Sequence, residues 1–290
     1  MITSREEKMR DIQEEINREE ERKKRNKIIK KTIKIVAVLL IIIVLMYFYI
    51  TRISTHSIIV KEKRVESKDI PENFDSYKIV YFSDLNYDGN RKDLDNLVKI
   101  INERRPNLLI YTGRLIKGKI SNSKKEYLIK KLNEIEAVSG KFALYRDDNE
   151  KSILIQSSFG ILDNDVREIY YNTGSPILLV GIDDIEKSSE ILDKFNDTGF
   201  KIMILENPDD ADNAYYKASM MLAGKSLNGE ICLVPDACLY KVDGAKKYYK
   251  QYYTVHDIPF YISGGIGTDK YSVRFNSRPM IYFFRLSRKN

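Results

Sequence analysis

The chain has 290 residues, of which 43% are hydrophobic and 31% are charged, and its formal net charge is +7. This composition can bury one large core and excludes a chain that is disordered throughout. Residues 1–34 hold 12 Lys and Arg against 8 Asp and Glu, so the basic excess left for the rest of the chain is too thin to indicate nucleic-acid binding.

Residues 1–31 are rich in Glu, Arg and Lys, with many opposite charges three or four positions apart, which predicts a helix. Its apolar stripe of Met9, Ile12 and Ile16 is too short for a coiled coil. We therefore expect a solvated helix that faces lipid headgroups.

An uncharged apolar run of sixteen residues follows at positions 35–50. A bilayer core requires roughly 17–25 apolar residues, so residues 33–50 are predicted to span a membrane at the short end of that range. The run has no polar face, which disfavours the alternative of a buried core helix. No small-residue cleavage site follows it, so we expect an uncleaved signal-anchor.

The charges that flank this run predict its orientation. Nine Lys and Arg lie in residues 15–34, and five lie in residues 51–68. Because the more basic flank stays in the cytoplasm, we expect a single-pass protein of the cell membrane with a cytoplasmic N-terminus and an extracytoplasmic C-terminal domain. The predicted parts are a charged tail at 1–32, the membrane helix at 33–50, a linker with an edge strand at 51–73 and a main domain at 74–290.

Runs of apolar residues predict the first elements after the membrane helix. Apolar and polar residues alternate along 57–65, which predicts an edge strand. The apolar run at 79–82 predicts a strand that is buried on both faces. A helix is predicted at about 91–104 and a second buried strand at 108–111. Strand, helix and strand make a βαβ unit, whose strand ends point to the same rim.

The later elements are predicted in the same way. A helix is expected at about 123–137, a strand at 141–145, and a helix near 186–197 between strands at 176–181 and 201–205. From residue 219 the pattern turns to β, with strands predicted at 220–223, 231–234, 249–255, 260–262 and 280–286. Because there is neither a repeat nor a low-complexity linker, residues 57–290 are expected to form one domain.

Several of these strands end on polar motifs. The strand at 79–82 stops on Ser83 and Asp84, where ligands and catalytic groups collect in open α/β sheets, although Asp84 could also merely begin a turn. The later motifs are T-G-R-L-I at 112–116, R-D-D-N at 146–149, L-V-G-I-D-D at 179–184, L-E-N-P-D at 205–209, A-G-K-S-L-N-G-E at 223–230, G-G-I-G-T at 264–268 and R-F-N-S-R-P-M at 274–280.

In this order, the motifs resemble those of the calcineurin-like metallophosphoesterases, in particular a membrane-anchored bacterial branch. In that family the first six read S-D-L-H, T-G-D-L-I, G-N-H-D, L-V-G-I-D-D, S-H-N-P-D and S-G-H-T-H-G-G-Q. The resemblance covers about residues 74–286. It implies an α/β fold, a four-layer α/β/β/α sandwich, here preceded by one transmembrane helix.

The resemblance also implies a site for two divalent metals, which polarise phosphoryl oxygens and generate a hydroxide nucleophile. Among the positions that align with the family's metal ligands, only Asp84 is unchanged. Asn86 stands at the position of the first-motif His, and Arg114 stands at the position of the bridging Asp. In the third motif Asp147 replaces the Asn ligand, and Asp148 replaces the His that helps to protonate the leaving group.

In the fifth motif Glu206 stands for the His ligand, and Lys225 and Leu227 stand for the two His of the sixth. The chain's only histidines, His56 and His256, fall on no ligand position. No Ser/His/Asp or Cys/His arrangement is credible with these two histidines either.

The substitutions predict a site without metal or other cofactor. Arg114 and Lys225 place positive charges where metal ligands belong, and like charges in a cleft repel by several kcal/mol. We expect carboxylates to neutralise these cations by salt bridges, with Asp84, Asp147, Asp148 and Glu206 facing Arg114, Lys225 and Arg146. The alternative is one divalent metal, Mn, Fe or Zn, held by Asp84, Asn86, Asp147 and Glu206.

Three other features permit only weak inferences. Cys232 and Cys238 are too few for a disulfide framework or a four-ligand zinc site, so core or loop thiols are expected, with a single bridge as the alternative. K-K-Y-Y-K-Q-Y-Y at 246–253 could stack on nucleic acid, but an alternating strand explains it as well, and no nucleic-acid partner is expected. G-G-I-G at 264–267 resembles a phosphate-cradling loop, but it lies between strands, so a structural turn is expected.

Two functional hypotheses follow. The first is a catalytically inactive, membrane-tethered protein, or pseudoenzyme, that binds a protein partner or an anionic envelope ligand through Arg114 and Lys225. The second is an active phosphoesterase with a rearranged, possibly single-metal site that acts on envelope or lipid-linked phosphoesters.

Overall fold

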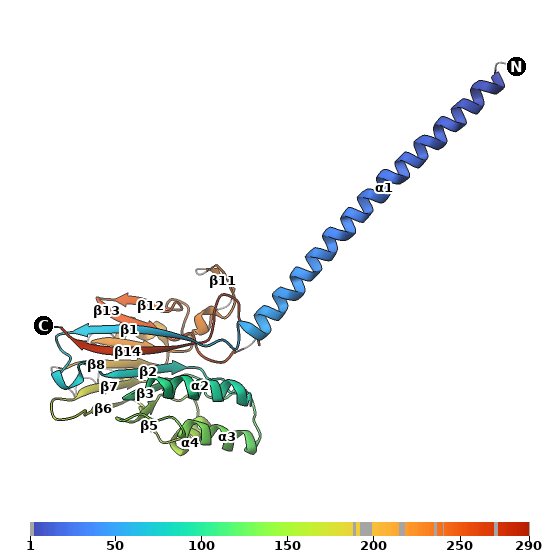
Figure 1. Cartoon of the computed structure of the whole chain (residues 1–290). Helices are drawn as coiled ribbons and strands as arrows, with labels where there is room; N and C mark the ends of the chain where they lie inside the picture. The colour runs from blue at the N-terminus through green and yellow to red at the C-terminus, as the bar shows by residue number, and fades with distance from the viewer. Residues whose placement is uncertain are drawn as a thin grey trace. The chain divides into compact units, whose positions relative to one another are not determined.

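The structure is a computed structural model that describes residues 3–187, 190–191, 199–214, 218–234, 237–239, 241–269 and 272–289. It divides into two compact units, Met1–Tyr49 and Ile50–Asn290. Figure 1 shows the chain coloured from its N-terminus to its C-terminus.

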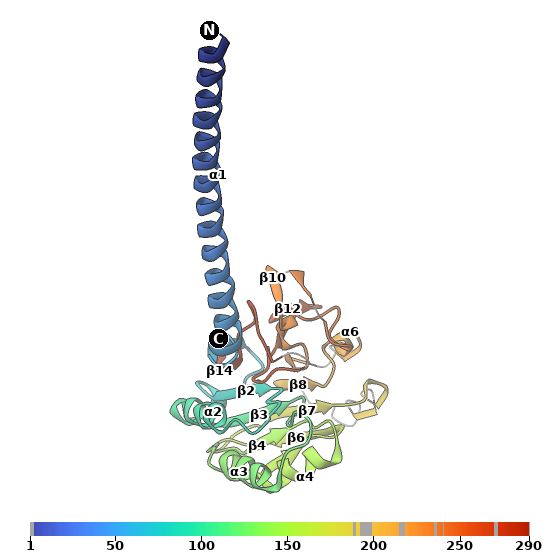
Figure 2. The same ribbon diagram turned by 90° about the vertical axis from the view of Figure 1, so that its right-hand side faces the viewer.

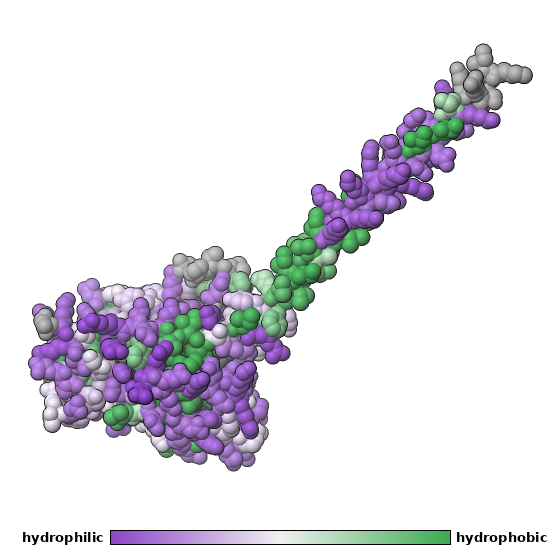
Figure 3. All heavy atoms as spheres, viewed as in Figure 1, coloured by the Kyte–Doolittle hydropathy of each residue, from purple (hydrophilic) through white to green (hydrophobic). Residues whose placement is uncertain are grey.

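The first unit is the helix α1 (Thr3–Phe48), which continues into a π-helical turn (Tyr49–Ile53). Ion pairs one turn apart, Arg18 with Glu14 and Lys23 with Glu19, follow from the charge spacing of its first half. Its second half is apolar on all sides, and Figure 3 shows the change from charged to apolar residues along the helix. This is one helix long and apolar enough to cross a membrane.

The second unit contains two six-stranded sheets. The order in the first sheet is β1 (Ile59–Ser67), β14 (Met280–Arg288), β2 (Lys78–Ser83), β3 (Leu108–Thr112), β4 (Lys141–Ala143) and β5 (Phe159–Ile161). The order in the second is β12 (Tyr252–Val255), β13 (Ile258–Ile262), β9 (Met220–Ala223), β8 (Lys201–Leu205), β7 (Ile177–Ile182) and β6 (Asp165–Ile169). In each sheet the central strands are parallel, so their carboxyl ends share one edge.

The two faces of each sheet bury different cores, because side chains alternate along a strand. In β2, Ile79 and Tyr81 pack between the sheets, whereas Val80 and Phe82 pack on the opposite face. That outer face is covered by three helices, α2 (Arg91–Arg104), α3 (Asn122–Asn133) and α4 (Asp148–Gln156), as Figure 2 shows.

The second sheet follows the same alternation. Ile202 and Ile204 of β8 belong to the core between the sheets, and Met203 and Leu205 belong to a third core on the far face. The short helix α6 (Ala211–Ala214) contributes to that outer core. The layers are helix, sheet, sheet and helix, which confirms the predicted α/β/β/α sandwich.

Most predicted elements are present, with changes at their ends. The helix expected at 91–104 is α2, which begins where the Asn90 side chain accepts a hydrogen bond from the Asp93 N–H and ends where Arg105 turns left-handed. The predicted edge strand is β1, at the edge of the first sheet. The helix expected near 186–197 lies largely outside the described residues. Helix α4 and strands β5 and β6 were not predicted.

The expectation of a strand across 246–253 was wrong for its first half. The carboxylate of Asp209 accepts hydrogen bonds from the backbone N–H groups of Lys246, Lys247 and Tyr248. These bonds hold the segment in a loop, and strand β12 begins only at Tyr252.

The expectation of free thiols was also wrong. Cys232 and Cys238 form a disulfide. The short strands β10 (Cys232–Val234) and β11 (Ala237–Cys238) pair antiparallel, and this register places the two cysteines opposite each other. Spacing alone does not reveal such a cross-strand pair.

A substitution of Phe284 tests the core between the sheets. Its ring is fully buried and lies 4.9 Å from that of Tyr261 in the other sheet, measured between centroids. We expect Phe284→Ala to lower the free energy of unfolding by about 3–5 kcal/mol, because it leaves a cavity. Urea unfolding of the detergent-solubilised protein measures this effect. The control Val138→Ala, at an exposed side chain, should change it by less than about 0.5 kcal/mol, and equal effects would contradict the assigned core.

Candidate functional site

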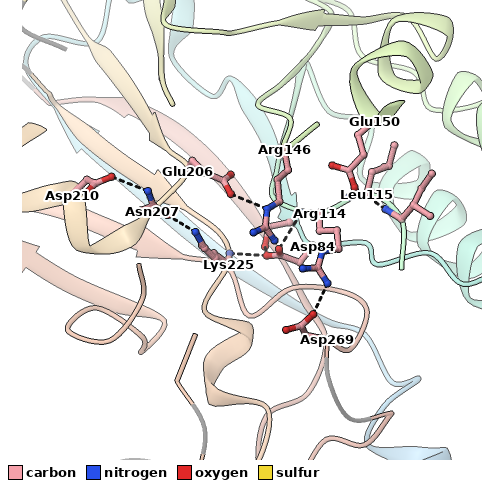
Figure 4. A network of polar contacts seen from close by, with 12 residues as sticks. Asp84, Arg114, Leu115, Arg146, Glu150, Glu206, Asn207, Asp210, Lys225 and Asp269 are labelled. Atoms are coloured by element: carbon pink, nitrogen blue, oxygen red, sulfur yellow. Dashed lines mark hydrogen bonds and ion pairs between the residues drawn. The ribbon is translucent and has the colours of Figure 1, made fainter. Parts of the chain in front are cut away.

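The carboxyl ends of strands from both sheets meet at a small cavity, which Figure 4 shows from close by. Asp84 follows β2 and Arg114 follows β3 in the first sheet, while Glu206 follows β8 and Lys225 follows β9 in the second. The cavity has a volume of about 40 Å³ and is lined by Asp84, Asn86, Arg114, Arg146, Lys225, Leu227, Val242 and Asp269.

Backbone N–H groups hold the buried carboxylate of Asp84. Its Oδ1 accepts a hydrogen bond from the N–H of Arg114 at 3.2 Å, and its Oδ2 accepts from the N–H of Lys225 and the hydroxyl of Ser83, both at 2.7 Å. Burial raises the pKa of Asp84, while these hydrogen bonds oppose the rise. Both carboxylate oxygens are thus engaged by loops that come from different sheets.

The guanidinium of Arg114 pairs with Asp269. Its Nη1 lies 2.5 Å from Asp269 Oδ1. The predicted set of neutralising carboxylates was therefore incomplete, because it omitted Asp269. The only signal in the sequence is that Asp269 directly follows the G-G-I-G-T motif.

Glu206 and Arg146 form a second ion pair. Arg146 Nε lies 3.4 Å from Glu206 Oε1, and Glu206 is 7% exposed. Burial, and then the charge of Asp84, raise the pKa of Glu206 to about 8, although Arg146 and Lys225 lower it. Near neutral pH this carboxyl group therefore carries a proton in a large fraction of molecules.

The ammonium group of Lys225 is directed to a turn after β8. Lys225 Nζ donates to Asn207 Oδ1, and Asn207 Nδ2 donates to Asp210 Oδ2 at 3.1 Å. Lys225 thus contacts Asp84 only through its backbone. The sequence analysis did not single out Asn207 and Asp210, because a hydrogen-bond chain between loops has no local pattern.

Asp147 and Asp148 begin a helix. Asp147 is the N-cap of α4, where its Oδ1 accepts the Glu150 N–H at 3.0 Å, and both Asp147 and Asp148 are exposed. Neither lines the cavity around Asp84. Asp147 lines a neighbouring pocket together with Arg114 and Arg146, so its expected role beside these cations stays a prediction.

Glu150, which the sequence analysis missed, supports the loop after β3. Its buried Oε1 accepts hydrogen bonds from the N–H groups of Leu115 and Ile116 at 2.7 and 3.1 Å. Burial raises the pKa of Glu150, and these bonds oppose the rise. Glu150 therefore positions the backbone that follows Arg114.

The motif at 264–268 forms a turn around a buried arginine. Arg274 is fully buried and donates hydrogen bonds to the carbonyl oxygens of Gly264 at 2.8 Å, Gly267 at 3.2 Å and Ser277 at 3.1 Å. Burial lowers the pKa of Arg274 to about 10. This turn carries Asp269 to the cavity, as expected of a structural turn.

Part of the backbone that lines the cavity is left-handed. A positive φ is uncommon for residues other than glycine and typically costs about 1–3 kcal/mol where the region is sparsely populated. The following non-glycine residues that line the cavity have a positive φ: Asp84, Asn86, Lys225 and Leu227.

The side chains at the cavity do not fit two divalent metals. In the described ranges, no group of three or more His, Cys, Asp or Glu side chains could hold a metal ion. The lining includes three basic residues, Arg114, Arg146 and Lys225, against two carboxylates. Both oxygens of Asp84 also accept backbone hydrogen bonds, which compete with a metal ion for their lone pairs.

Comparison with known proteins agrees with the strand-end motifs. No family model matches the chain. Two Bacillus subtilis proteins are similar over most of their length: one named uncharacterized metallophosphoesterase YkuE, 26% identical over 84% of this chain and 91% of its own, and one named uncharacterized metallophosphoesterase YkoQ, 22% identical over 83% and 94%. A solved crystal structure covers 65% of this chain and 90% of its own at 10% identity, with a TM-score of 0.42 that is too low to support an argument.

With two relatives of that name across most of the chain, the predicted family is confirmed.

Substitutions of two glycines with similar φ angles test the packing around Asp84. A Cβ on Gly113, whose φ is 79°, would lie 2.3 Å from Asp84 Oδ1, whereas a Cβ on Gly118, whose φ is 68°, would meet nothing within 4 Å. Both Gly→Ala variants incur a left-handed backbone penalty of roughly 1–2 kcal/mol. Gly113→Ala should lose about 1–3 kcal/mol more in urea unfolding, because it displaces the carboxylate. Equal losses would argue against the tight contact.

The raised pKa of Glu206 predicts a pH dependence of stability. A carboxyl group whose pKa is higher in the folded state stabilises the protein below its unfolded pKa of 4.5, and this contribution is lost as the pH rises towards about 8. Glu206→Gln should therefore reduce the fall in unfolding free energy between pH 5 and about 8, as measured by urea unfolding. The exposed control Glu136→Gln should leave the fall unchanged, and a parallel fall in Glu206→Gln would contradict the assignment.

Proposed function

We propose that the chain is a membrane-anchored, catalytically inactive member of its family that acts as a binding or scaffold protein. The observation that carries this proposal is the state of Asp84. Asp84 is the only residue that is unchanged among the positions of the family's metal ligands. Its two oxygens accept hydrogen bonds from the backbone N–H groups of Arg114 and Lys225. These two residues occupy the positions of other ligands in the family.

Electrostatics supports the same proposal. Two unit charges 4 Å apart interact by about 4 kcal/mol at an effective dielectric constant of 20, so each fixed cation near a divalent ion opposes its binding by several kcal/mol. Arg114 and Arg146 bring two guanidinium groups to the lining of the cavity. Arg114 is paired with Asp269 and Arg146 with Glu206, so both guanidinium groups have partners without an ion.

Anchoring in a membrane is supported by α1 and by the charges around it. The apolar half of α1 is long enough to span a bilayer. The excess of Lys and Arg in residues 15–34 favours a cytoplasmic N-terminus. The disulfide between Cys232 and Cys238 is consistent with an extracytoplasmic domain, because disulfides persist in oxidising compartments.

A protein partner is better supported than an anionic ligand at Arg114 and Lys225. An anion would have to compete with Asp269 for the Arg114 guanidinium. It would also have to replace Asn207 at the Lys225 ammonium group. The binding function is therefore proposed for a surface of the domain rather than for the cavity around Asp84.

Metal content and hydrolysis test the proposal together. The full-length protein, purified in detergent with Mn²⁺ added and then dialysed, should contain far less than one Mn, Fe or Zn ion per chain by elemental analysis. It should hydrolyse an aryl phosphate no faster than its Asp84→Ala variant does. A near-stoichiometric metal with hydrolysis that Asp84→Ala abolishes would establish the alternative, an active phosphoesterase.

A further inference from the structure

A small set of large apolar side chains is exposed on the second unit, whose other apolar side chains pack mainly in the three cores. Among its described residues, the exposed large hydrophobic side chains are those of Ile53, Val138, Ile155, Tyr170, Leu239 and Tyr252. A singly exposed apolar residue is ordinary, so only its position can assign it a partner. Leu239 is 68% exposed and directly follows strand β11.

The strands β10 and β11, together with Leu239, form a cross-linked hairpin, the disulfide hairpin. The bond between Cys232 and Cys238 joins its two antiparallel strands. The N–H of Leu239 donates to the carbonyl oxygen of Ile231 at 2.8 Å, which extends the pairing beyond the disulfide. Because this backbone is already constrained, little conformational freedom is lost when Leu239 binds a partner.

Backbone contacts connect the disulfide hairpin to the first residue of the second unit. Ile231 forms a parallel bridge with Phe275. The N–H of the preceding residue, Arg274, donates to the carbonyl oxygen of Ile50 at 3.4 Å. Neighbouring strands lie about 5 Å apart and successive Cα atoms about 3.8 Å apart, so Leu239 lies within roughly 20 Å of Ile50. Figure 1 shows β11, and Figure 2 shows β10, on the side of the second unit where the chain enters it.

Ile50 is the last residue of the apolar run. If α1 spans a membrane, Ile50 therefore marks the surface of the bilayer on the side of the second unit. Three residues further on, Ile53 is 48% exposed, and the exposed Arg52 beside it suits the phosphate groups of lipids. Two exposed apolar side chains, Ile53 and Leu239, thus lie close to the end of the anchor.

We propose that the disulfide hairpin contacts the bilayer that α1 spans, with Leu239 inserted among the lipid headgroups and the upper part of the acyl chains. The partner is lipid rather than protein, because the anchor holds Leu239 next to lipid at a high effective concentration. Transfer of the leucine side chain from water into lipid is favourable. This inference rests on the proposed membrane anchoring, but it does not depend on whether the cavity around Asp84 holds a metal.

A second contact restricts how the second unit is oriented on the membrane. The peptide chain at Ile50 alone leaves this unit free to tilt, whereas an additional contact at Leu239, on a separate segment, opposes the tilt. The segment 223–230 carries Lys225 to the cavity around Asp84 and leads directly into β10. The contact therefore also places this cavity at a defined distance from the lipid.

Tryptophan fluorescence tests the contact directly, because the chain contains no tryptophan of its own. The full-length variants Leu239→Trp, Val138→Trp and Tyr47→Trp are each reconstituted in phosphatidylcholine nanodiscs, with or without bromine on the acyl chains close to the headgroup. Bromine quenches a tryptophan that it contacts. Val138, 80% exposed before β4, is the matched control for the preference of any exposed tryptophan for membrane interfaces. Tyr47, in the apolar run, reports on the anchor itself.

We expect brominated lipid to quench Tyr47→Trp strongly and Leu239→Trp by at least half as much, and to leave Val138→Trp unquenched. The water-soluble quencher acrylamide should quench Val138→Trp more than Leu239→Trp. Because the Leu239 side chain is exposed, its replacement should leave the midpoint of urea unfolding unchanged, so a loss of the contact is not a loss of the fold.

The outcomes separate this contact from the anchoring on which it rests. Quenching of Tyr47→Trp without quenching of Leu239→Trp overturns the contact and leaves the anchoring intact, whereas an unquenched Tyr47→Trp overturns both. Equal quenching of Val138→Trp and Leu239→Trp shows unspecific adsorption and overturns the contact. Protection of Leu239→Trp from acrylamide without quenching by bromine means that a protein covers the hairpin, which overturns it as well.

Discussion

Two backbone N–H groups, one from each sheet, converge on the carboxylate of Asp84. Arg114 contributes its N–H from the loop after β3, and Lys225 contributes its N–H from the loop after β9. A buried carboxylate that accepts two peptide hydrogen bonds fixes both loops relative to β2. The positions of the surrounding side chains depend on this contact, because each loop directs its own cation away from Asp84.

The cavity combines an uncommon backbone conformation with side chains that pair with one another and leave no set of ligands for divalent metals. The backbone there includes four non-glycine residues with a positive φ, which is an uncommon conformation. The side chains form separate polar groups: Arg114 with Asp269, Arg146 with Glu206, and Lys225 with Asn207 and Asp210. Each cation is satisfied inside the protein, which accounts for a stable cleft whose lining opposes divalent ions.

The sequence predicted the central strands and the helix α2 because short apolar strands and an amphipathic helix have clear periods, whereas the layers of the fold followed from the resemblance of the strand-end motifs to a family. Ile79 to Phe82 and residues 91–104 show them without ambiguity. The site was predicted in part, because Asp84, Arg114 and Lys225 lie within two residues of the ends of strands. Asp269 escaped prediction because it contacts Arg114 across 155 positions, and the helix cap at Asp147 was not foreseen because Asp caps helices as readily as it follows strands. The Cys232–Cys238 bridge depended on a pairing register that spacing does not encode.

Arg274 shows how a side chain that lines neither cavity influences both. Its guanidinium donates hydrogen bonds to the carbonyl oxygens of Gly264 and Gly267. The next two residues are Thr268, which lines the pocket beside His56, and Asp269, which lines the cavity around Asp84. A lysine cannot replace it, because one ammonium group does not reach carbonyls on both sides of a turn in the fixed planar geometry of a guanidinium. Both cavities therefore depend on the hydrogen bonds of Arg274, and loss of this side chain would change the lining of both at once.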